Sequence, residues 1–535
     1  MTPFKLSRNL AAVQILLYGL FCLVLLVSCA PDNGKAGDMT GDPQGKTVTV
    51  SPDRTTMFRN PFSGWMIYSG LGSGISENFW ERYDNFPSSK GTVNVPRDYA
   101  PILLIRVIWA EANPQEGVYA WQDDCDTPQA RRFKMLVRGA RERNMRLAFN
   151  FGADSRDKHD NACPEYVRER GCKVFESQTG SAKVWTPYPD DPIFQECYAG
   201  FIHAFAQEFN DPDITAFAGG FGIGKWGEYH ACIYSTGDDS PREQVFDFLT
   251  DTFVKEFTRI PITLNAHRWI GTGVQWDGDR FDPDSERLVQ KGVDKGFSLQ
   301  SAAFGMKTWF GNWEKSMLFN NRYDVPVASE GGWVKASHGD NYKGDGYRDW
   351  ADVRKGEFLD AQGSCVNTMD LRYNESLEVS EAWSWFNEAY EYVERFIQEG
   401  CYRIYPDRLT LPESFGHGDK VTISHRWQNL GWSYCPTNIK QWEGRYRTAF
   451  ALIDKETLQP VSIRFDEQAR PSDWIKGKPR SYVFETVYDD VPPGEYAWAV
   501  GIADAWKDNR PGIFIAAKQN VTPDGWLRLM DVTVE

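Results

Sequence analysis

The chain has 535 residues, 41% of them hydrophobic and 25% charged, and a formal net charge of −15. This length exceeds one ordinary domain, but it accommodates a barrel of roughly 300 residues or more and a smaller second module. The acidic balance argues against nucleic acid or an anionic membrane surface as the main partner. The 21 Trp and 23 Tyr residues exceed what a core needs, although core packing would account for about half of them. Aromatic rings with polar edges suit stacking on sugar faces.

The first 29 residues have the pattern of an export signal. Lys5 and Arg8 precede an almost wholly apolar run at 10–27, which ends in Leu26-Val-Ser-Cys29. That ending resembles the lipobox of bacterial lipoprotein signal peptides, which implies lipid attachment at Cys29. The alternative is a transmembrane anchor, since the run approaches spanning length. We expect an exported lipoprotein of the outer membrane, with 1–29 as signal peptide and 30–50 as flexible tether.

Ten cysteines are present, of which Cys22 would leave with the signal and Cys29 would carry the lipid. The others belong to an exported protein, where disulfides are permitted. Cys163 and Cys172 lie in one predicted loop and could pair, but spacing alone does not determine connectivity. No CxxC or HExxH motif occurs, so we expect no bound metal and no cofactor.

Between about 60 and 400, short apolar runs alternate with amphipathic segments, which is typical of a parallel α/β architecture. Strands are predicted at 64–69, 101–109, 145–152, from 214, and at 261–265, 297–304, 325–330 and 364–371. Helices are expected at 128–144, 191–209, 240–258, 284–295, 311–321, 347–362 and 376–399. Eight strands with intervening helices are the count that a (β/α)8 TIM barrel demands, and we assign this barrel to 51–401.

The pattern changes beyond Cys401 and predicts a second domain at 402–535. Alternating strands are expected at 421–427, 446–454, 482–487, 494–501 and 526–534. Turn signals such as Pro492-Pro-Gly494 and Pro523-Asp-Gly525 separate them, and no long helix intervenes. The sequence therefore predicts an antiparallel β-sandwich in the size range of immunoglobulin-like modules.

Two barrel strands end in a glutamate that is flanked by glycine and aromatic residues. The run from 214 ends in Trp226-Gly-Glu-Tyr-His230, and the strand at 325–330 ends in Glu330, followed by two glycines and Trp333. Active sites of parallel barrels lie at the carboxyl ends of the strands. Glu228 and Glu330 would therefore meet at one rim, where they could act as the acid/base and the nucleophile of a glycosidase.

Each glutamate also has a plain structural interpretation. Glu228 could pair with Lys225 or cap a helix, whereas partial desolvation by the aromatic residues beside it would favour proton donation. Glu330 could bind a sugar hydroxyl or cap the next helix. As a nucleophile it must stay ionised, and Arg106, in the middle of a buried strand, needs such a partner.

The segment Trp109-Ala-Glu-Ala-Asn-Pro-Gln-Glu-Gly-Val-Tyr-Ala-Trp121 resembles the strand-two loop of retaining β-glycosidases, in the barrel clan that includes bacterial β-galactosidases. The resemblance implies acid/base at Glu228 and nucleophile at Glu330. It departs at Asn113, where the clan usually has a glutamate. It also departs at Gly227, where the clan has an asparagine that binds the sugar 2-hydroxyl, so Asn150 or His267 would have to make that contact. The Gly-x-Gly-x-Trp-Gly-Glu-x-His run also resembles uncharacterised bacterial lipoproteins with a barrel and a sandwich.

Further residues near the predicted strand ends are expected to bind substrate. They are Arg106, Trp109, Glu111, Asn150, Trp226, His230, His267, Arg268, Trp309, Trp333 and Trp383, with Asp370 and Trp385 beside them. Each has an alternative: Trp383 and Trp385 could pack on the last strand, and Asp370 could pair with Arg372.

Together these patterns predict a membrane-anchored glycoside hydrolase that cleaves β-linked oligo- or polysaccharide with retention. The alternative is a non-catalytic glycan-binding lipoprotein that keeps the barrel scaffold. A hydrolase or lyase for charged polysaccharides would be favoured if Arg106, Arg268 and Lys225 lined the pocket.

Overall fold

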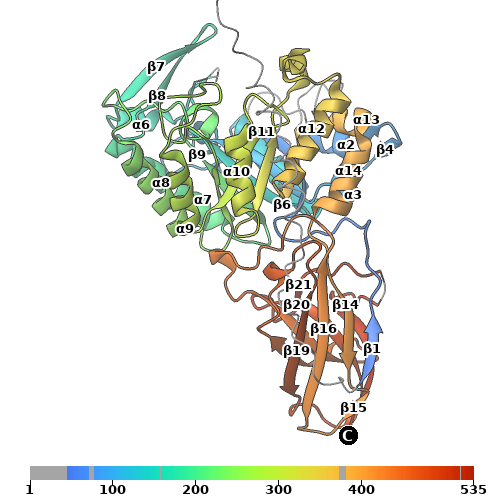
Figure 1. Cartoon of the computed structure of the whole chain (residues 1–535). Coiled ribbons are helices and arrows are strands. Elements are labelled where there is room, and N and C mark those ends of the chain that lie inside the picture. Colours follow the sequence, from blue (N-terminus) through green and yellow to red (C-terminus); the bar gives the residue numbers. More distant parts are fainter. Residues whose placement is uncertain (1–44, 71–76, 157, 159, 373–380, 519) are drawn as a thin grey trace, which may run out of the picture. The chain divides into compact units, whose positions relative to one another are not determined.

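The computed structural model describes residues 45–535 apart from 71–76, 157, 159, 373–380 and 519 (Figure 1). The predicted signal peptide at 1–29, its lipidation residue Cys29 and most of the predicted tether lie outside these residues. Over the described ranges, no helix combines the length and the apolar character needed to cross a bilayer.

Eight parallel strands close into a barrel, which confirms the predicted (β/α)8 fold. They are β2 (Gly64–Gly70), β5 (Ile102–Ile108), β6 (Arg146–Gly152), β9 (Thr215–Gly222), β10 (Ile262–Asn265), β11 (Ser298–Phe304), β12 (Val327–Gly331) and β13 (Thr368–Arg372). β13 pairs with β2 and closes the ring. The strands are almost continuously buried because helices cover their outer side and side chains fill the inside.

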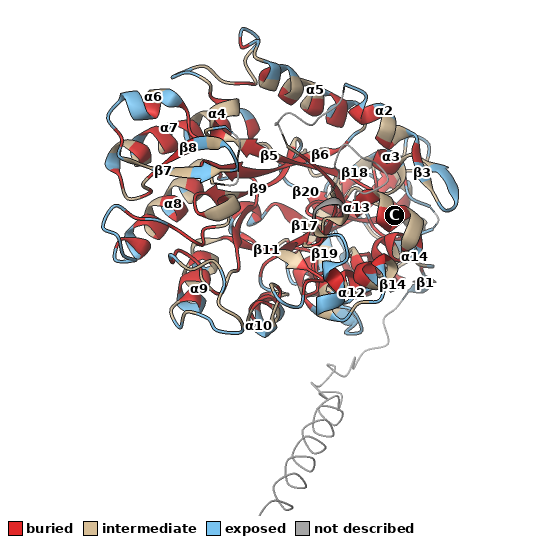
Figure 2. Cartoon of the chain, turned by 90° about the horizontal axis from the view of Figure 1, so that it is seen from above, coloured by how far each residue is buried: buried red, intermediate tan, exposed pale blue. Residues whose placement is uncertain are grey.

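Helices surround the barrel with their buried sides toward the strands (Figure 2). The principal ones are α5 (Pro128–Glu142), α7 (Pro192–Phe209), α8 (Arg242–Glu256), α9 (Ser285–Lys295), α10 (Asn312–Asn321), α12 (Trp350–Gly363), α13 (Glu381–Glu388) and α14 (Tyr390–Arg395). Caps set several starts: the Thr127 hydroxyl accepts from the Ala130 N–H, and the Asp191 carboxylate accepts from the Ile193 N–H.

The last helix was predicted as one segment over 376–399, and this was wrong for the described part. Ala389 leaves the helical conformation at φ −144°, which separates α13 from α14, and a short π-helix (η4, Phe396–Gly400) follows. Short elements that the sequence did not predict are α2 (Phe79–Asp84), β3 (Phe86–Ser88), β4 (Gly91–Val93), α3 (Val95–Asp98), α4 (Trp109–Ala112), α6 (Glu165–Glu169), β7 (Val174–Thr179), β8 (Ala182–Pro187), η1 (Lys225–Gly227), α11 (Lys335–His338) and η2 (Asn341–Asp345).

The C-terminal domain consists of two sheets, as predicted. One is β1 (Lys46–Thr49), β14 (Ile404–Leu411), β16 (Lys420–Asn429) and β19 (Arg480–Val487). The other is β15 (Ser414–Phe415), β22 (Leu527–Val534), β20 (Gly494–Asp504), β17 (Tyr446–Asp454) and β18 (Pro460–Asp466), with β21 (Pro511–Ile513) on β20. Short turns η5 (Lys440–Trp442) and η6 (Pro471–Asp473) join strands.

One boundary of the predicted tether is corrected. Lys46–Thr49 form β1 rather than flexible chain, and pair antiparallel with Arg408–Leu411 of β14. Three of the four residues are β-branched, which suits a strand, and Val48 packs against the sandwich core.

The sandwich packs against the amino ends of the barrel strands. One buried cluster combines Phe62 and Ile102 of the barrel with Tyr402 and Trp442 of the second domain. The Asn367 amide, just before β13, donates to the Tyr434 carbonyl at 3.0 Å. This contact leaves the carboxyl ends of the strands for a site.

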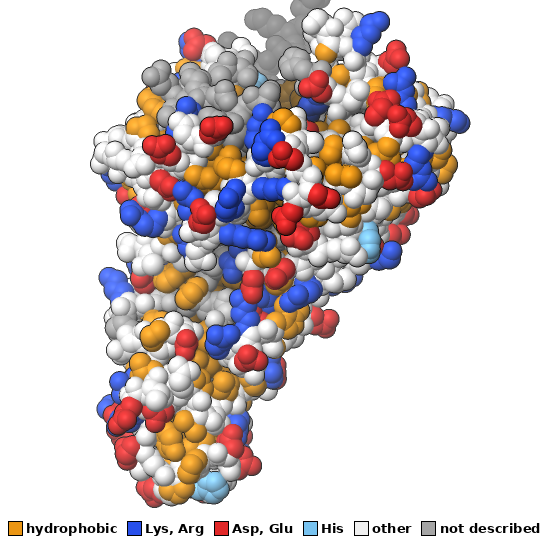
Figure 3. All heavy atoms as spheres, turned by 180° about the vertical axis from the view of Figure 1, so that it is seen from behind, with side chains coloured by type: hydrophobic (Ala, Val, Ile, Leu, Met, Phe, Trp, Pro, Cys, Tyr) orange, Lys and Arg blue, Asp and Glu red, His pale blue; other side chains and the backbone are white. Residues whose placement is uncertain are grey.

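Two further observations bear on the sequence predictions. Every cysteine in the described part has a free thiol, so Cys163 and Cys172 are not paired, and both are buried. On the face shown in Figure 3, acidic and basic side chains are interspersed, and the negative net charge forms no single extended patch there.

Candidate active site

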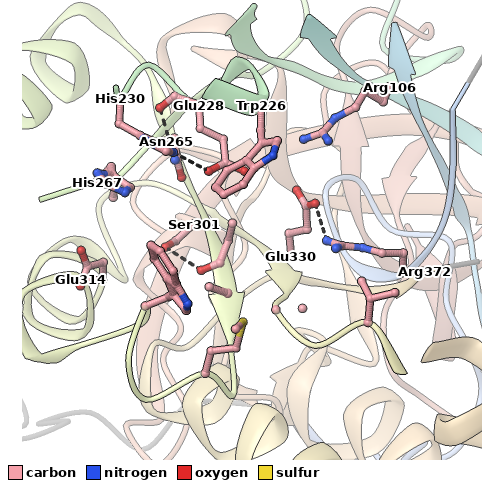
Figure 4. Close-up of a pocket in the computed structure, with 18 of the residues that line it drawn as sticks. Arg106, Trp226, Glu228, His230, Asn265, His267, Ser301, Glu314, Glu330 and Arg372 are labelled. Atoms are coloured by element: carbon pink, nitrogen blue, oxygen red, sulfur yellow. Dashed lines mark hydrogen bonds and ion pairs between the residues drawn. The ribbon is translucent and has the colours of Figure 1, made fainter. Parts of the chain in front are cut away.

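A cavity of about 340 Å³ opens at the carboxyl ends of the barrel strands and falls in the usual size range of ligand sites. It receives both predicted glutamates, Glu228 and Glu330 (Figure 4). The other functional side chains that line it are Arg106, Trp226, His230, Asn265, His267, Ser301, Met306, Trp309, Glu314, His338 and Arg372. The two carboxyl groups therefore share one cavity, as expected from their positions at the carboxyl ends of parallel strands.

The loop that carries Glu228 has an unusual backbone. Trp226, Tyr229 and Ala231 have φ between 50° and 58°, a region that costs non-glycine residues about 1–3 kcal/mol each. Local hydrogen bonds hold this shape: the Lys225 N–H donates to the His230 carbonyl at 2.8 Å, and the Tyr229 N–H to the Ile223 carbonyl at 2.9 Å. The strained loop directs Glu228 into the cavity.

The backbone conformation at residue 227 accounts for the glycine found there in place of the asparagine of the similar clan. Its φ is +81°, and a Cβ at this position would lie 2.4 Å from the Phe151 carbonyl oxygen. An asparagine cannot occupy this position without a backbone shift. Asn265 and His267 line the cavity instead and offer polar groups to a ligand.

Two histidines lie beside Glu228. His230 Nε2 is 3.2 Å from Glu228 Oε2, and the His230 ring stacks on His267 with centroids 4.2 Å apart. Burial, followed by His230 and Arg268, lowers the pKa of His267 well below its usual value. His267 Nδ1 accepts from the Trp269 N–H at 3.0 Å, so the neutral ring carries its proton on Nε2 and can donate it to a ligand.

Glu330, the residue before the last one of β12, lies near the guanidinium groups of Arg372 and Arg106. Its side chain is buried and accepts a charge-assisted hydrogen bond from Arg372, while Oε2 has no partner within the described part of the chain. Burial alone would lower the pKa of Arg372, but Glu330, Asp370 and Tyr68 raise it well above its usual value. Arg372, rather than the expected Arg106, is thus the direct partner.

Arg106 acts on the same site at longer range. Burial is outweighed by Tyr68, Glu330 and Glu228, so the pKa of Arg106 is raised. Burial in turn raises the pKa of Tyr68 to about 12. Two guanidinium groups therefore interact with the Glu330 carboxyl group, Arg372 directly and Arg106 at longer range.

Three acidic side chains behind Glu330 were missed as a group by the sequence analysis. Asp370 Oδ1 accepts from the Gly331 N–H at 2.6 Å, and Glu357 Oε2 accepts from Arg354 at 2.6 Å. Burial raises the pKa of Asp370 to about 6, of Glu357 to about 8 and of Glu381 to about 7. Glu357 and Glu381 come from helices, where acidic residues usually face solvent, so no local signal distinguishes them.

Several predicted substrate residues have structural roles instead. Trp109 is buried among aromatic rings, with the Tyr198 centroid 5.2 Å away, and Trp333 is buried with its indole N–H on the Gly305 carbonyl. Neither ring has a free face for a sugar. Trp385 is wholly buried in the barrel core.

Arg268 also has a structural role. It forms a buried ion pair with Glu314, in which Nε donates to Oε1 at 2.7 Å, and both side chains are 3% exposed. Its Nη1 donates to the Gly278 carbonyl at 3.0 Å. Arg268 therefore holds the loop after β10 in place and is not available to bind a ligand.

The remaining predicted residues lie outside the cavity lining. Burial raises the pKa of Glu111 to about 7 near Arg132. Asn150 is buried, and Trp383 is half-buried with the Lys335 ammonium 4.9 Å from its ring centroid. Asn265 and Arg372, by contrast, end β10 and β13, so the strand-end rule could have found them.

No family model and no curated protein matches the chain. Endo-glycoceramidase II from Rhodococcus sp. is similar in structure at 11% identity and a TM-score of 0.40, over 82% of this chain and 100% of that one. An exo-beta-1,4-mannosidase from an Opitutaceae bacterium has 12% identity and a TM-score of 0.36, over 65% and 62% of the chains.

An endoxylanase from Clostridium papyrosolvens has 8% identity and a TM-score of 0.36, over 83% of this chain and 96% of that one. Likenesses at these levels carry no argument about activity.

The chemistry available in the cavity is that of two carboxyl groups in unlike surroundings. No cluster of three or more His, Cys, Asp or Glu side chains in the described ranges is arranged to hold a metal ion. Glu330 contacts a guanidinium group and Glu228 an imidazole. Paired carboxyl groups with different partners suit one ionised and one proton-donating role.

Proposed function

We propose that the protein is a retaining glycoside hydrolase for β-linked oligo- or polysaccharide. The observation that carries this proposal is that Glu228 and Glu330 line one cavity at the carboxyl ends of the strands with different charge partners. A cavity wall with several hydrogen-bond donors suits the hydroxyl groups of a sugar.

In the proposed reaction, Glu330 attacks the anomeric carbon as a carboxylate, and Arg372 keeps its attacking group oriented. Glu228 donates a proton to the leaving oxygen, and the bond from that oxygen to the anomeric carbon breaks. Water, deprotonated by Glu228, then releases the sugar from Glu330 with net retention. His267 and Asn265 are placed to bind sugar hydroxyls.

The test is hydrolysis of aryl β-glycosides and glycosyl fluorides by the purified protein, with product stereochemistry followed by NMR. Glu330→Gln should abolish turnover while the protein stays folded, which a cooperative unfolding transition would show. Glu111→Gln is a matched control, because Glu111 is a half-buried glutamate just after β5 and outside the cavity lining. Full activity of Glu330→Gln would refute the assignment.

The same assay separates the non-catalytic alternative, which would bind oligosaccharide and release no sugar. A hydrolase or lyase for charged polysaccharides receives less support. Arg268 is engaged by Glu314, and the Lys225 ammonium donates to Gln275 Oε1 at 3.0 Å.

We also propose that the protein is exported and anchored to the outer membrane through lipid on Cys29. The support is the lipobox-like ending of the apolar N-terminal run. Palmitate labelling of the wild-type chain and its loss in Cys29→Ala, with release from the membrane fraction, would test this. Labelling that persists in Cys29→Ala would refute it.

A further inference from the structure

An exposed tryptophan lies next to the cavity and has no role in the mechanism above. Trp276, in the loop after β10, is 41% exposed, whereas most tryptophans of the described chain are buried or half-buried. Large exposed rings beside a cavity are typical of binding surfaces. The Trp276 ring therefore needs an explanation other than core packing.

Trp276 continues an aromatic surface that begins inside the cavity. Trp309 lines the cavity, and the centroids of the two rings are 5.3 Å apart at an interplanar angle of 46°. Trp309 lies on the side of His267 and Glu314, because its carbonyl accepts from Arg268, the ion-pair partner of Glu314, at 3.3 Å. The two indoles thus lead from the site to the surface.

Contacts from neighbouring loops hold the Trp276 ring in place. Its indole N–H donates to the Thr308 carbonyl at 3.1 Å, and the Thr308 hydroxyl donates to Asp345 at 2.8 Å. The preceding Gln275 accepts from Lys225 at 3.0 Å. A ring that is already ordered loses little entropy when a ligand stacks on it.

The position of Glu228, the proposed acid, indicates which part of the substrate would reach the aromatic surface of Trp309 and Trp276. In Figure 4, Arg106 and Arg372 lie on one side of Glu330, whereas His230, His267 and Glu314 lie on the other side, beyond Glu228. A glycosidase acid protonates the leaving-group oxygen, so the leaving group lies on the side of the acid. This is the side of Trp309 and Trp276.

We propose that Trp276, together with Trp309, forms a stacking platform for a sugar unit of the leaving group. The proposal rests on the proposed function, and it identifies the substrate class as an oligo- or polysaccharide that extends beyond the scissile bond. Trp276 is a specificity residue that selects a saccharide leaving group over a small one.

Two substrate types test the platform in the purified protein. β-Glycosyl fluorides have no sugar in the leaving group, whereas β-linked oligosaccharides of two to six units do. Trp276→Ala should lower kcat/KM on the oligosaccharides about tenfold, which corresponds to the loss of about 1.4 kcal/mol of stacking. It should leave the fluoride rate within about twofold.

Trp276→Phe, which keeps a ring, should recover most of the loss. Phe281→Ala is the matched control, because Phe281 is 51% exposed on the same loop, and it should behave like wild type on both substrates. Unchanged oligosaccharide kinetics in Trp276→Ala, or an equal loss on both substrate types, would overturn the platform.

Failure of the catalytic proposal is distinguishable from failure of the platform. If wild type hydrolyses nothing, calorimetric titration of the same oligosaccharides into wild type and Trp276→Ala decides the matter. Weaker binding by Trp276→Ala supports the platform without catalysis. Equal binding by the two proteins, or no binding by wild type, overturns it.

Discussion

Gly227→Ala should destabilise the protein and impair the site at once. The residue has φ +81°, and a Cβ would lie 2.4 Å from the Phe151 carbonyl oxygen, about 1 Å inside ordinary contact. A left-handed conformation costs an alanine about 1–2 kcal/mol, and forced overpacking adds about 1–3 kcal/mol. The free energy of unfolding should therefore fall by about 2–5 kcal/mol.

Gly237→Ala separates these two contributions. Gly237 has nearly the same φ, +79°, but a Cβ added there would meet no atom within 4 Å. It should lose only the conformational part, about 1–2 kcal/mol. Urea unfolding followed by tryptophan fluorescence would compare the free energies of unfolding of the two variants with wild type.

Activity gives a second readout of the same clash. A shift of about 1 Å in the loop displaces Glu228, and misplacement of this size costs about a hundredfold in rate. Gly237→Ala should keep its activity. Equal unfolding free energies for the two variants, or wild-type activity in Gly227→Ala, would refute the steric argument.

Three other perturbations have defined outcomes. Glu228→Gln should lower kcat/KM for oligosaccharides far more than kcat/KM for glycosyl fluorides, because kcat/KM reports the first step and fluoride leaves without protonation. Equal losses in kcat/KM on the two substrates would contradict the acid role. Arg268→Met should lower the free energy of unfolding by about 3–5 kcal/mol, because it leaves the buried Glu314 unpaired. The double variant Arg268→Met with Glu314→Leu should recover most of this loss. If the double variant recovers nothing, the loss does not come from the ion pair. Burial raises the pKa of Glu381 to about 7, so the folded state holds a proton that the unfolded state releases above about pH 4.5. As pH rises from about 4.5 to 7, the free energy of unfolding of wild type should therefore fall by up to about 3 kcal/mol relative to that of Glu381→Gln. Urea unfolding of both proteins across this pH range would measure it, and parallel curves of unfolding free energy against pH would contradict it.

Local pattern was enough to predict most of the fold. Apolar runs bounded by turn residues predicted all eight barrel strands within a few residues, and the strands of both sandwich sheets in part. The pattern failed at β1, because Lys46–Thr49 form a strand only through pairing with Arg408–Leu411, far away in the chain. Strand pairing over such a distance leaves no local signal.

The sequence by itself determined which strand ends carry carboxylates, and this was sufficient to predict that Glu228 and Glu330 share a rim, since parallel strands place their carboxyl ends together. Only the tertiary structure decided which neighbours take part. Arg268 and Trp109 also follow strand ends, but neither is free to bind a ligand. Arg268 is paired with the buried Glu314 carboxylate, and Trp109 is packed among aromatic rings. The physical reason is that chain position sets where a side chain begins, whereas its charge partner, its exposure and its free face depend on segments that meet only in the folded barrel.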